Sequence, residues 1–127
     1  MRKARILVCD DEEGIRESLD LVLGKDHRLT FASDGEEAIT KATEQAFDLA
    51  LVDIKMPRVN GLEVLKWFRQ HQPGVPVLML TAYQSVEMAQ EAVALGATDY
   101  LAKPFERAEF KKTIKRVLAE SSTVKKM

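Results

Sequence analysis

Short apolar runs alternate with longer amphipathic stretches along almost the whole sequence. Each apolar run is followed by about ten or more residues whose apolar side chains recur at helical spacing, as Ile15, Leu19 and Leu23 do. Strand–helix units repeated in this way predict a parallel sheet with helices on both faces. The expected strands are Ala4–Cys9, Arg28–Ala32, Asp48–Val52, Pro76–Leu80 and Thr98–Ala102.

The apolar runs differ in character, and the difference bears on strand order. Ile6–Cys9, Leu49–Val52 and Val77–Leu80 are continuously apolar, which is typical of strands buried on both faces. The second run alternates at Leu29–Phe31 and the last begins with polar residues, so strands 2 and 5 are expected at the edges. Two orders remain, 2-1-3-4-5 and 2-3-1-4-5. We favour the first, a flavodoxin-like (βα)5 doubly wound parallel sheet of the α/β class.

Local signals predict where some helices begin and where the domain ends. Ser33–Glu36 predicts a capping box that opens the second helix, and Ser85 is a candidate cap for the fourth. We expect one domain over residues 1–120, with 121–127 as a loose tail or the start of a linker.

Composition excludes several function classes. The 127 residues carry 19 Lys and Arg against 20 Asp and Glu, and a net charge of −1 excludes a strongly basic nucleic-acid-binding domain. One cysteine, Cys9, excludes an internal disulfide framework and a cysteine-built zinc site. Ile6–Cys9 is too short for a signal peptide, and no stretch approaches the roughly 18 apolar residues of a membrane span. We therefore expect a cytoplasmic domain that binds neither membranes nor nucleic acid.

Polar side chains follow four of the five expected strands. Asp10 and Asp11 come after the first strand and Asp53 after the third, while Thr81 follows the fourth and Lys103 the fifth. Because the carboxyl ends of parallel strands meet at one edge of the sheet, we expect these side chains to converge. Taken singly, each has a simpler explanation as a helix cap, a turn residue or a solvated lysine. Their coincidence at one edge favours a shared site.

The charges of this group predict a divalent cation. Three neighbouring carboxylates repel one another, and Lys103 offsets only one of their charges. Oxygen ligands without a nearby His or Cys suit Mg²⁺, or Mn²⁺ in its place. Lys103 and the Thr81 hydroxyl would then bind phosphoryl oxygens. The carboxylate of Asp53 would be the nucleophile that forms an aspartyl phosphate.

With these residues in place, the sequence resembles the receiver domain of bacterial two-component response regulators over about residues 4–120. Each matching motif is short, but their joint order and spacing are specific. The motifs are Val8–Glu12, Val52–Pro57, Asn60–Gly61, Leu80–Ala82, Gly96–Tyr100 and Lys103–Phe105.

The resemblance implies a regulatory phosphoacceptor rather than an enzyme. Asp53 would accept a phosphoryl group from a sensor histidine kinase or a phosphotransfer protein. Mg²⁺ would be coordinated by Asp11, Asp53 and the backbone carbonyl of Lys55, with Asp10 acting mainly through water. The phosphorylated domain would control an output domain or a partner.

The resemblance also implies a conformational switch. Thr81 and Tyr100 correspond to the switch pair of the family, and the Lys103–Pro104 bond is expected to be cis. A phosphorylation-dependent homodimer through helix 4, strand 5 and helix 5 is one expected output. The last helix carries basic residues that are typical of a solvated face, and the alternative is that they meet Glu87 and Glu91 across such a dimer. These basic residues are Arg107, Lys111, Lys112 and Lys115.

Two side chains are expected to set the lifetime of the phosphorylated state. Lys55 and Tyr83 stand two residues after Asp53 and Thr81, where they would flank the path of an attacking water. Neither is a carboxylate or carboxamide that could orient this water, which predicts slow self-dephosphorylation. The alternative is that both side chains point into solvent and have no effect.

Three other functions would require different sequence features. A magnesium-dependent phosphatase of the haloacid dehalogenase type would carry Asp-x-Asp after its first strand, where this chain has Asp10–Glu12. A flavodoxin-like electron carrier would need a Ser/Thr/Gly-rich loop there instead of acidic residues. A degenerate receiver that acts only as a binding module would lack some of the residues named above, and all are present.

Overall fold

Five parallel strands form one sheet in the order β2-β1-β3-β4-β5, in a computed structural model that describes residues 3–82 and 86–126, with side chains as far as residue 120. The order confirms the predicted fold class and places β2 and β5 at the edges. The strands are β1 (Ala4–Cys9), β2 (His27–Ala32), β3 (Leu49–Asp53), β4 (Val77–Ala82) and β5 (Asp99–Lys103). The helices are α1 (Glu13–Leu23), α2 (Gly35–Glu44), α3 (Gly61–His71), α4 (Val86–Ala94) and α5 (Arg107–Lys126).

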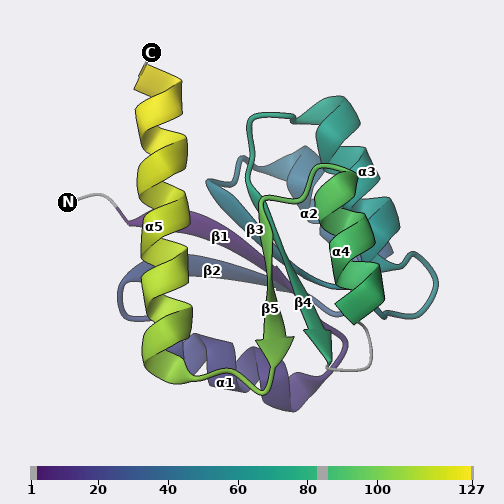
Figure 1. Ribbon diagram of the computed structural model, residues 1–127, viewed down its shortest axis with the longest axis horizontal. Coiled ribbons are helices and arrows are strands. Elements are labelled where there is room, and N and C mark those ends of the chain that lie inside the picture. Colours follow the sequence, from purple (N-terminus) through teal and green to yellow (C-terminus); the bar gives the residue numbers. More distant parts are fainter. Residues whose placement is uncertain (1–2, 83–85, 127) are drawn as a thin grey trace.

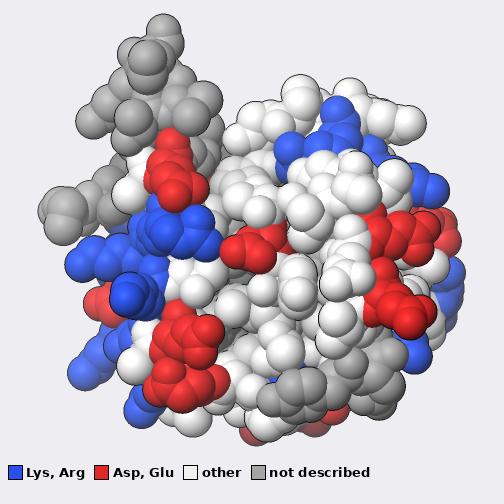
Figure 2. Space-filling model, in the orientation of Figure 1, with Lys and Arg blue, Asp and Glu red and all other residues white. Residues whose placement is uncertain are grey.

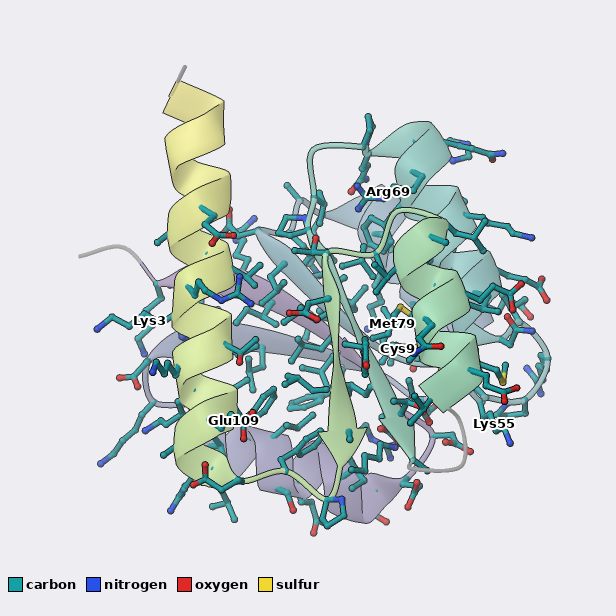
Figure 3. The ribbon with its side chains drawn as sticks, viewed as in Figure 1. Lys3, Cys9, Lys55, Arg69, Met79 and Glu109 are labelled. Atoms are coloured by element: carbon teal, nitrogen blue, oxygen red, sulfur yellow. The ribbon has the colours of Figure 1, made fainter. Side chains whose placement is uncertain are left out.

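The two faces of the sheet are covered by different helices (Figure 1). Because successive strand residues point to opposite faces, Leu7 and Cys9 of β1 pack in the layer of α2, α3 and α4. Ile6 and Val8 pack in the layer of α1 and α5. Figure 3 shows Cys9 with Met79 of β4 in the first of these layers. The central strands are therefore apolar on both faces, as their continuous apolar runs predicted.

The start of α2 differs from the sequence prediction by one residue. Its N-cap is Asp34, whose carboxylate accepts a hydrogen bond from the Glu37 amide at 2.8 Å. The Glu37 carboxylate accepts one from the Ser33 amide at 2.7 Å. The expected box over Ser33–Glu36 is thus shifted, because the extended backbone of Asp34 brings Glu37 rather than Glu36 into reach. Ser85, the candidate cap of α4, lies outside the described residues.

The last helix is longer than expected. It continues to Lys126, past the boundary placed at residue 120 and through the segment expected to be loose. Arg107–Lys126 contains no Gly or Pro, so no residue in it interrupts the helical hydrogen bonds. Across the described part of the chain, no helix has the length and apolar character that crossing a membrane requires.

Gly61 lets α3 begin directly against the end of β3. Its amide donates a hydrogen bond to the Ile54 carbonyl at 2.8 Å. A Cβ on Gly61 would overlap the carbonyl oxygen of Asp53. The absence of a side chain at this position therefore allows the backbone after Asp53 to turn into α3.

We predict that Gly61→Ala lowers the free energy of unfolding by about 1–3 kcal/mol, because the added methyl displaces the backbone of Asp53. Gly14→Ala in α1 is the matched control, since nothing lies within 4 Å of a Cβ there. This control should gain up to about 1 kcal/mol from its better helix propensity. Urea denaturation measures both. Unchanged stability of Gly61→Ala would contradict the close approach.

Candidate functional site

The pairing of β1 with β3 brings two predicted site residues together. Cys9 is level with Val52 in this parallel pair, so Asp10 and Asp53 follow side by side. The Asp10 amide still donates to the sheet, to the carbonyl of Ala32 at 3.1 Å. Both carboxyl groups lie at the carboxyl edge of the sheet, where the sequence placed them.

The pairing of β4 with β3 and β5 brings the Thr81 hydroxyl and the Lys103 ammonium to the same edge of the sheet. Asp53 is level with Leu80, one residue before Thr81, and Thr81 is level with Ala102, one residue before Lys103. Asp53, Thr81 and Lys103 belong to the strands themselves, whereas the apolar pattern predicts that each strand ends one residue before them. The ladder hydrogen bonds therefore hold their backbone directly.

Lys103 is the centre of a cluster of charges. Its Nζ lies 2.8 Å from Oδ2 of Asp10 and 3.5 Å from Oδ2 of Asp53. It also lies 3.4 Å from Oε1 of Glu12. The Lys103 side chain is only 11% exposed, and the Asp10 side chain is fully buried. One ammonium thus faces three carboxylates, so negative charge remains in excess.

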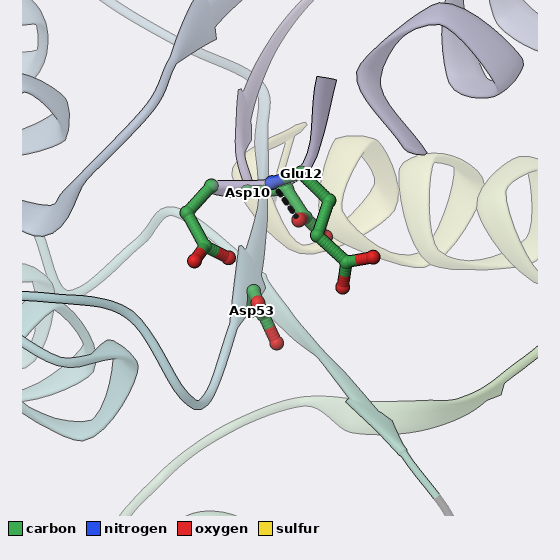
Figure 4. A group of neighbouring side chains, drawn as sticks. Asp10, Glu12 and Asp53 are labelled. Atoms are coloured by element: carbon green, nitrogen blue, oxygen red, sulfur yellow. Dashed lines mark hydrogen bonds between the residues drawn. The ribbon is translucent and has the colours of Figure 1, made fainter. Parts of the chain in front are cut away.

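The carboxylates form a candidate metal site. Oxygens of Asp10, Asp11, Glu12 and Asp53 all lie within 4.8 Å of one another. Figure 4 shows Asp10 and Glu12 on the segment after β1, facing Asp53 at the end of β3. A compact set of oxygen donors without His or Cys fits Mg²⁺ or Mn²⁺. The residues present therefore suit the predicted ion.

Burial changes the acidity of these groups. Burial and then the Asp10 charge raise the pKa of Asp53 to about 7, although Lys103 acts in the opposite direction. Burial is also the main reason why the pKa of Asp10 is raised. For Lys103, burial alone would lower the pKa, but the hydrogen bond to Asp10 and the charges of Asp10, Asp53 and Glu12 together raise it. Repulsion among the carboxylates is thus only partly relieved.

Two residues of the site were not predicted from the sequence. Glu12 contributes a carboxylate to the cluster, and its amide donates to Oδ1 of Asp10 at 2.9 Å (Figure 4). Arg16 of α1 donates from Nη1 to the Asp10 carbonyl at 2.7 Å. The acidic run after β1 contained the signal for Glu12. Arg16 stands one helical turn after Glu12, where its side chain can reach back to the end of the strand.

A pocket of about 330 Å³ opens over the cluster. The Thr81 hydroxyl, at the pocket wall, donates to the Ala82 carbonyl at 3.0 Å. The lining residues are Asp11, Glu12, Asp53, Ile54, Lys55, Thr81, Ala82 and Lys103.

The remaining predicted residues lie away from this pocket or outside the description. Tyr100 is level with Met79, half-buried against the layer of α2, α3 and α4, and does not line the pocket. Tyr83 lies outside the described residues. The Lys103–Pro104 bond is cis, as expected.

Known sequences similar to this chain belong to one protein family. The family model described as "Response regulator receiver domain" matches residues 6–115, which include every residue of the candidate site described above. The transcriptional regulatory protein ZraR of Klebsiella oxytoca is 40% identical over 91% of this chain, but the match spans only 26% of ZraR. Sporulation initiation phosphotransferase F of Bacillus subtilis is 37% identical over 93% of this chain and 96% of its own length.

Solved structures give the same result. NtrX of Brucella abortus superposes with a TM-score of 0.93 at 30% identity, covering 98% of this chain and 29% of NtrX. The chemotaxis protein CheY4 of Vibrio cholerae superposes with a TM-score of 0.84 at 37% identity, covering 91% of this chain and 99% of CheY4. The chain therefore spans about a quarter of the length of ZraR and NtrX and nearly all of the two shorter proteins.

We predict that Lys103→Met lowers the free energy of unfolding by about 3–5 kcal/mol, because the buried Asp10 carboxylate loses its counter-ion. Millimolar Mg²⁺ should restore more stability to this variant than it adds to the wild type, since a cation replaces the missing charge. Lys66→Met, at an exposed position of α3, is the control and should change neither quantity. Urea denaturation with and without MgCl₂ tests this. A response to Mg²⁺ no larger than that of the wild type would contradict the electrostatic role.

Proposed function

Because this chain belongs to the family of response regulator receiver domains, we propose that it accepts a phosphoryl group on Asp53 and thereby controls an output domain or a partner. The observation that carries the proposal is the position of Asp53, which lines the pocket 3.5 Å from the Lys103 ammonium and beside three further carboxylates. Receiver domains are in general regulatory rather than enzymatic. The proposed donor is a sensor histidine kinase or a phosphotransfer protein.

The proposed chemistry is a direct displacement at phosphorus. An oxygen of the ionised Asp53 carboxylate bonds to phosphorus while the bond from phosphorus to the donor histidine nitrogen breaks, and that nitrogen keeps the electron pair. The Lys103 ammonium stabilises the charge on the phosphoryl oxygens. The Thr81 hydroxyl exchanges its bond to the Ala82 carbonyl for one to a phosphoryl oxygen.

A divalent cation is part of this proposal. Asp11, Asp53 and the backbone carbonyl of Lys55 would hold Mg²⁺ or Mn²⁺, with Asp10 acting through water, and all but Asp10 line the pocket. When bound, the ion neutralises the carboxylates and the approaching phosphoryl oxygens. Glu12 is close enough to join this ligand set.

Location and further partners are also proposals. We infer a cytoplasmic domain that itself binds neither membranes nor nucleic acid, and the net charge of −1 supports the last point. The proposed homodimer would use α4, β5 and α5.

Phosphorylation is tested with a small donor. Incubation with acetyl phosphate and Mg²⁺ should add one phosphoryl group per chain, measured by intact mass, and chelation of the metal should prevent it. Asp53→Ala should abolish the adduct, whereas Asp20→Ala, which removes an exposed carboxylate of α1, should retain it. An adduct that persists in Asp53→Ala would overturn the assignment. A wild type without an adduct would favour the degenerate receiver, a binding module only.

The switch is tested at Thr81. Thr81 and Tyr100 lie on adjacent paired strands, so inward movement of the hydroxyl toward a phosphoryl group would open space that the ring can enter. We predict that Thr81→Ala is still phosphorylated but loses most phosphorylation-dependent dimerisation in analytical ultracentrifugation, whereas Thr81→Ser keeps it. Equal dimerisation of phosphorylated Thr81→Ala and wild type would count against this coupling. A phosphorylated wild type that stays monomeric would refute the dimer.

The lifetime of the phosphorylated state is tested at Lys55 and Tyr83. Lys55 is exposed at the pocket wall and offers no acceptor to an attacking water when charged. We predict that Lys55→Asn/Tyr83→Glu loses its phosphoryl group at least about tenfold faster than wild type, a modest share of the ~10²–10⁴-fold effect of positioned acids and bases. Phosphoryl loss is followed by intact mass at constant Mg²⁺. An unchanged rate would mean that these side chains do not govern the lifetime.

A further inference from the structure

A second pocket lies where β1 and β2 begin, at the edge of the sheet opposite Asp53. It is an open cleft of about 840 Å³ between the end of α1, the start of β2 and one side of α5. Leu23, Leu118 and Ala4 supply an apolar part of its lining. Its size falls in the range of about 300–1,000 Å³ that is usual for sites of small organic ligands.

Four lysines line this pocket. Among the described residues, none of the four forms an ion pair, and all are exposed. Asp26 is the one acidic residue among the described residues of the lining. His27 also lines the pocket, and burial lowers its pKa, which favours the neutral ring. The described lining residues therefore carry a formal charge of +3, and their lysines are Lys3, Lys25, Lys111 and Lys115.

The geometry of α5 separates these lysines from the proposed dimer face. Lys111 and Lys115 lie one helical turn apart on the side that faces the pocket. Arg116 points to the other side, where its Nη2 lies 3.2 Å from Oδ2 of Asp99 on β5. Figure 2 shows basic side chains along α5, and Figure 3 shows Lys3 beside the same helix. The basic residues of α5 thus do not form a single set, and two of them belong to the pocket.

We propose that this pocket binds a small amphipathic anion, namely a carboxylate, sulfonate or phosphate group carried on an alkyl or aryl body. Like charges around one cleft repel one another, and an anionic group would relieve that repulsion. The apolar part of the lining would bury the body of the ligand. An inorganic anion satisfies only the charges, and a neutral hydrocarbon satisfies only the apolar lining. The site is separate from Asp53, so the inference does not depend on phosphorylation.

The test uses three probes on the ¹⁵N-labelled protein, followed by amide chemical shifts. Octanesulfonate, below its micelle concentration, should bind saturably and shift the amides of Leu23, His27 and Leu118. Sulfate and 1-octanol should each bind at least about tenfold more weakly than octanesulfonate, because sulfate has no apolar body and 1-octanol has no negative charge. If sulfate binds as tightly as octanesulfonate, the apolar lining contributes nothing and the proposal is wrong. If 1-octanol binds as tightly as octanesulfonate, the lysines contribute nothing and the proposal is likewise wrong. Absence of saturable shifts with octanesulfonate would overturn the proposal.

Matched variants separate the pocket from the overall charge. Lys111→Gln/Lys115→Gln should weaken octanesulfonate binding at least about tenfold by removing two ammonium groups that face the ligand. Lys66→Gln/Lys112→Gln makes the same change in net charge at exposed lysines outside the pocket, one of them on α5, and should bind like wild type. Equal weakening in both pairs would show diffuse attraction instead of a site.

Discussion

The candidate site depends on one buried ion pair. Asp10 has no exposed surface, and a carboxylate buried without a counter-ion is costly. The Lys103 ammonium offsets that cost from 2.8 Å away. The same ammonium is shared with Asp53 and Glu12, so it cannot neutralise the whole group. The excess of negative charge favours a cation at this edge of the sheet, beside the Asp53 carboxylate that we propose as the phosphoryl acceptor.

This arrangement requires a fixed register between β1 and β3, which apolar patterning alone does not supply. A strand that alternates apolar and polar residues resists slipping by one residue, because the slip would bury its polar face. Strands that are apolar on both faces lack that protection, so polar groups at their ends must hold them. Asp48 accepts a hydrogen bond from the Arg5 amide at 2.8 Å and donates its own amide to the Arg5 carbonyl at 2.7 Å. This exchange at one end and the cluster around Lys103 at the other fix the register.

The sequence predicts the elements well because strand and helix patterns are local. The apolar pattern predicts that β2 and β5 lie at the edges of the sheet. Together with the parallel topology, it also predicts that Asp10, Asp53 and Lys103 lie close together. The apolar pattern does not determine the order of the inner strands, since β1 and β3 are equally apolar and either could stand beside β2. The acidic run after β1 marks Glu12 as a candidate. The actual contacts of Glu12 and Arg16 do not follow from the sequence, because they depend on how the backbone turns after β1 and on which way long side chains point.

A net charge of −1 conceals a division of charge along β1. Its carboxyl end leads into the acidic cluster and the start of α1, where the helix dipole favours negative groups. Its amino end lies in the cleft lined by lysines that have no ion-pair partner within the described part of the chain. Helical periodicity, not composition, decides this separation, since Lys111 and Lys115 face the cleft while Arg116 faces β5. Charge totals therefore exclude a strongly basic domain without excluding a local site for an anion.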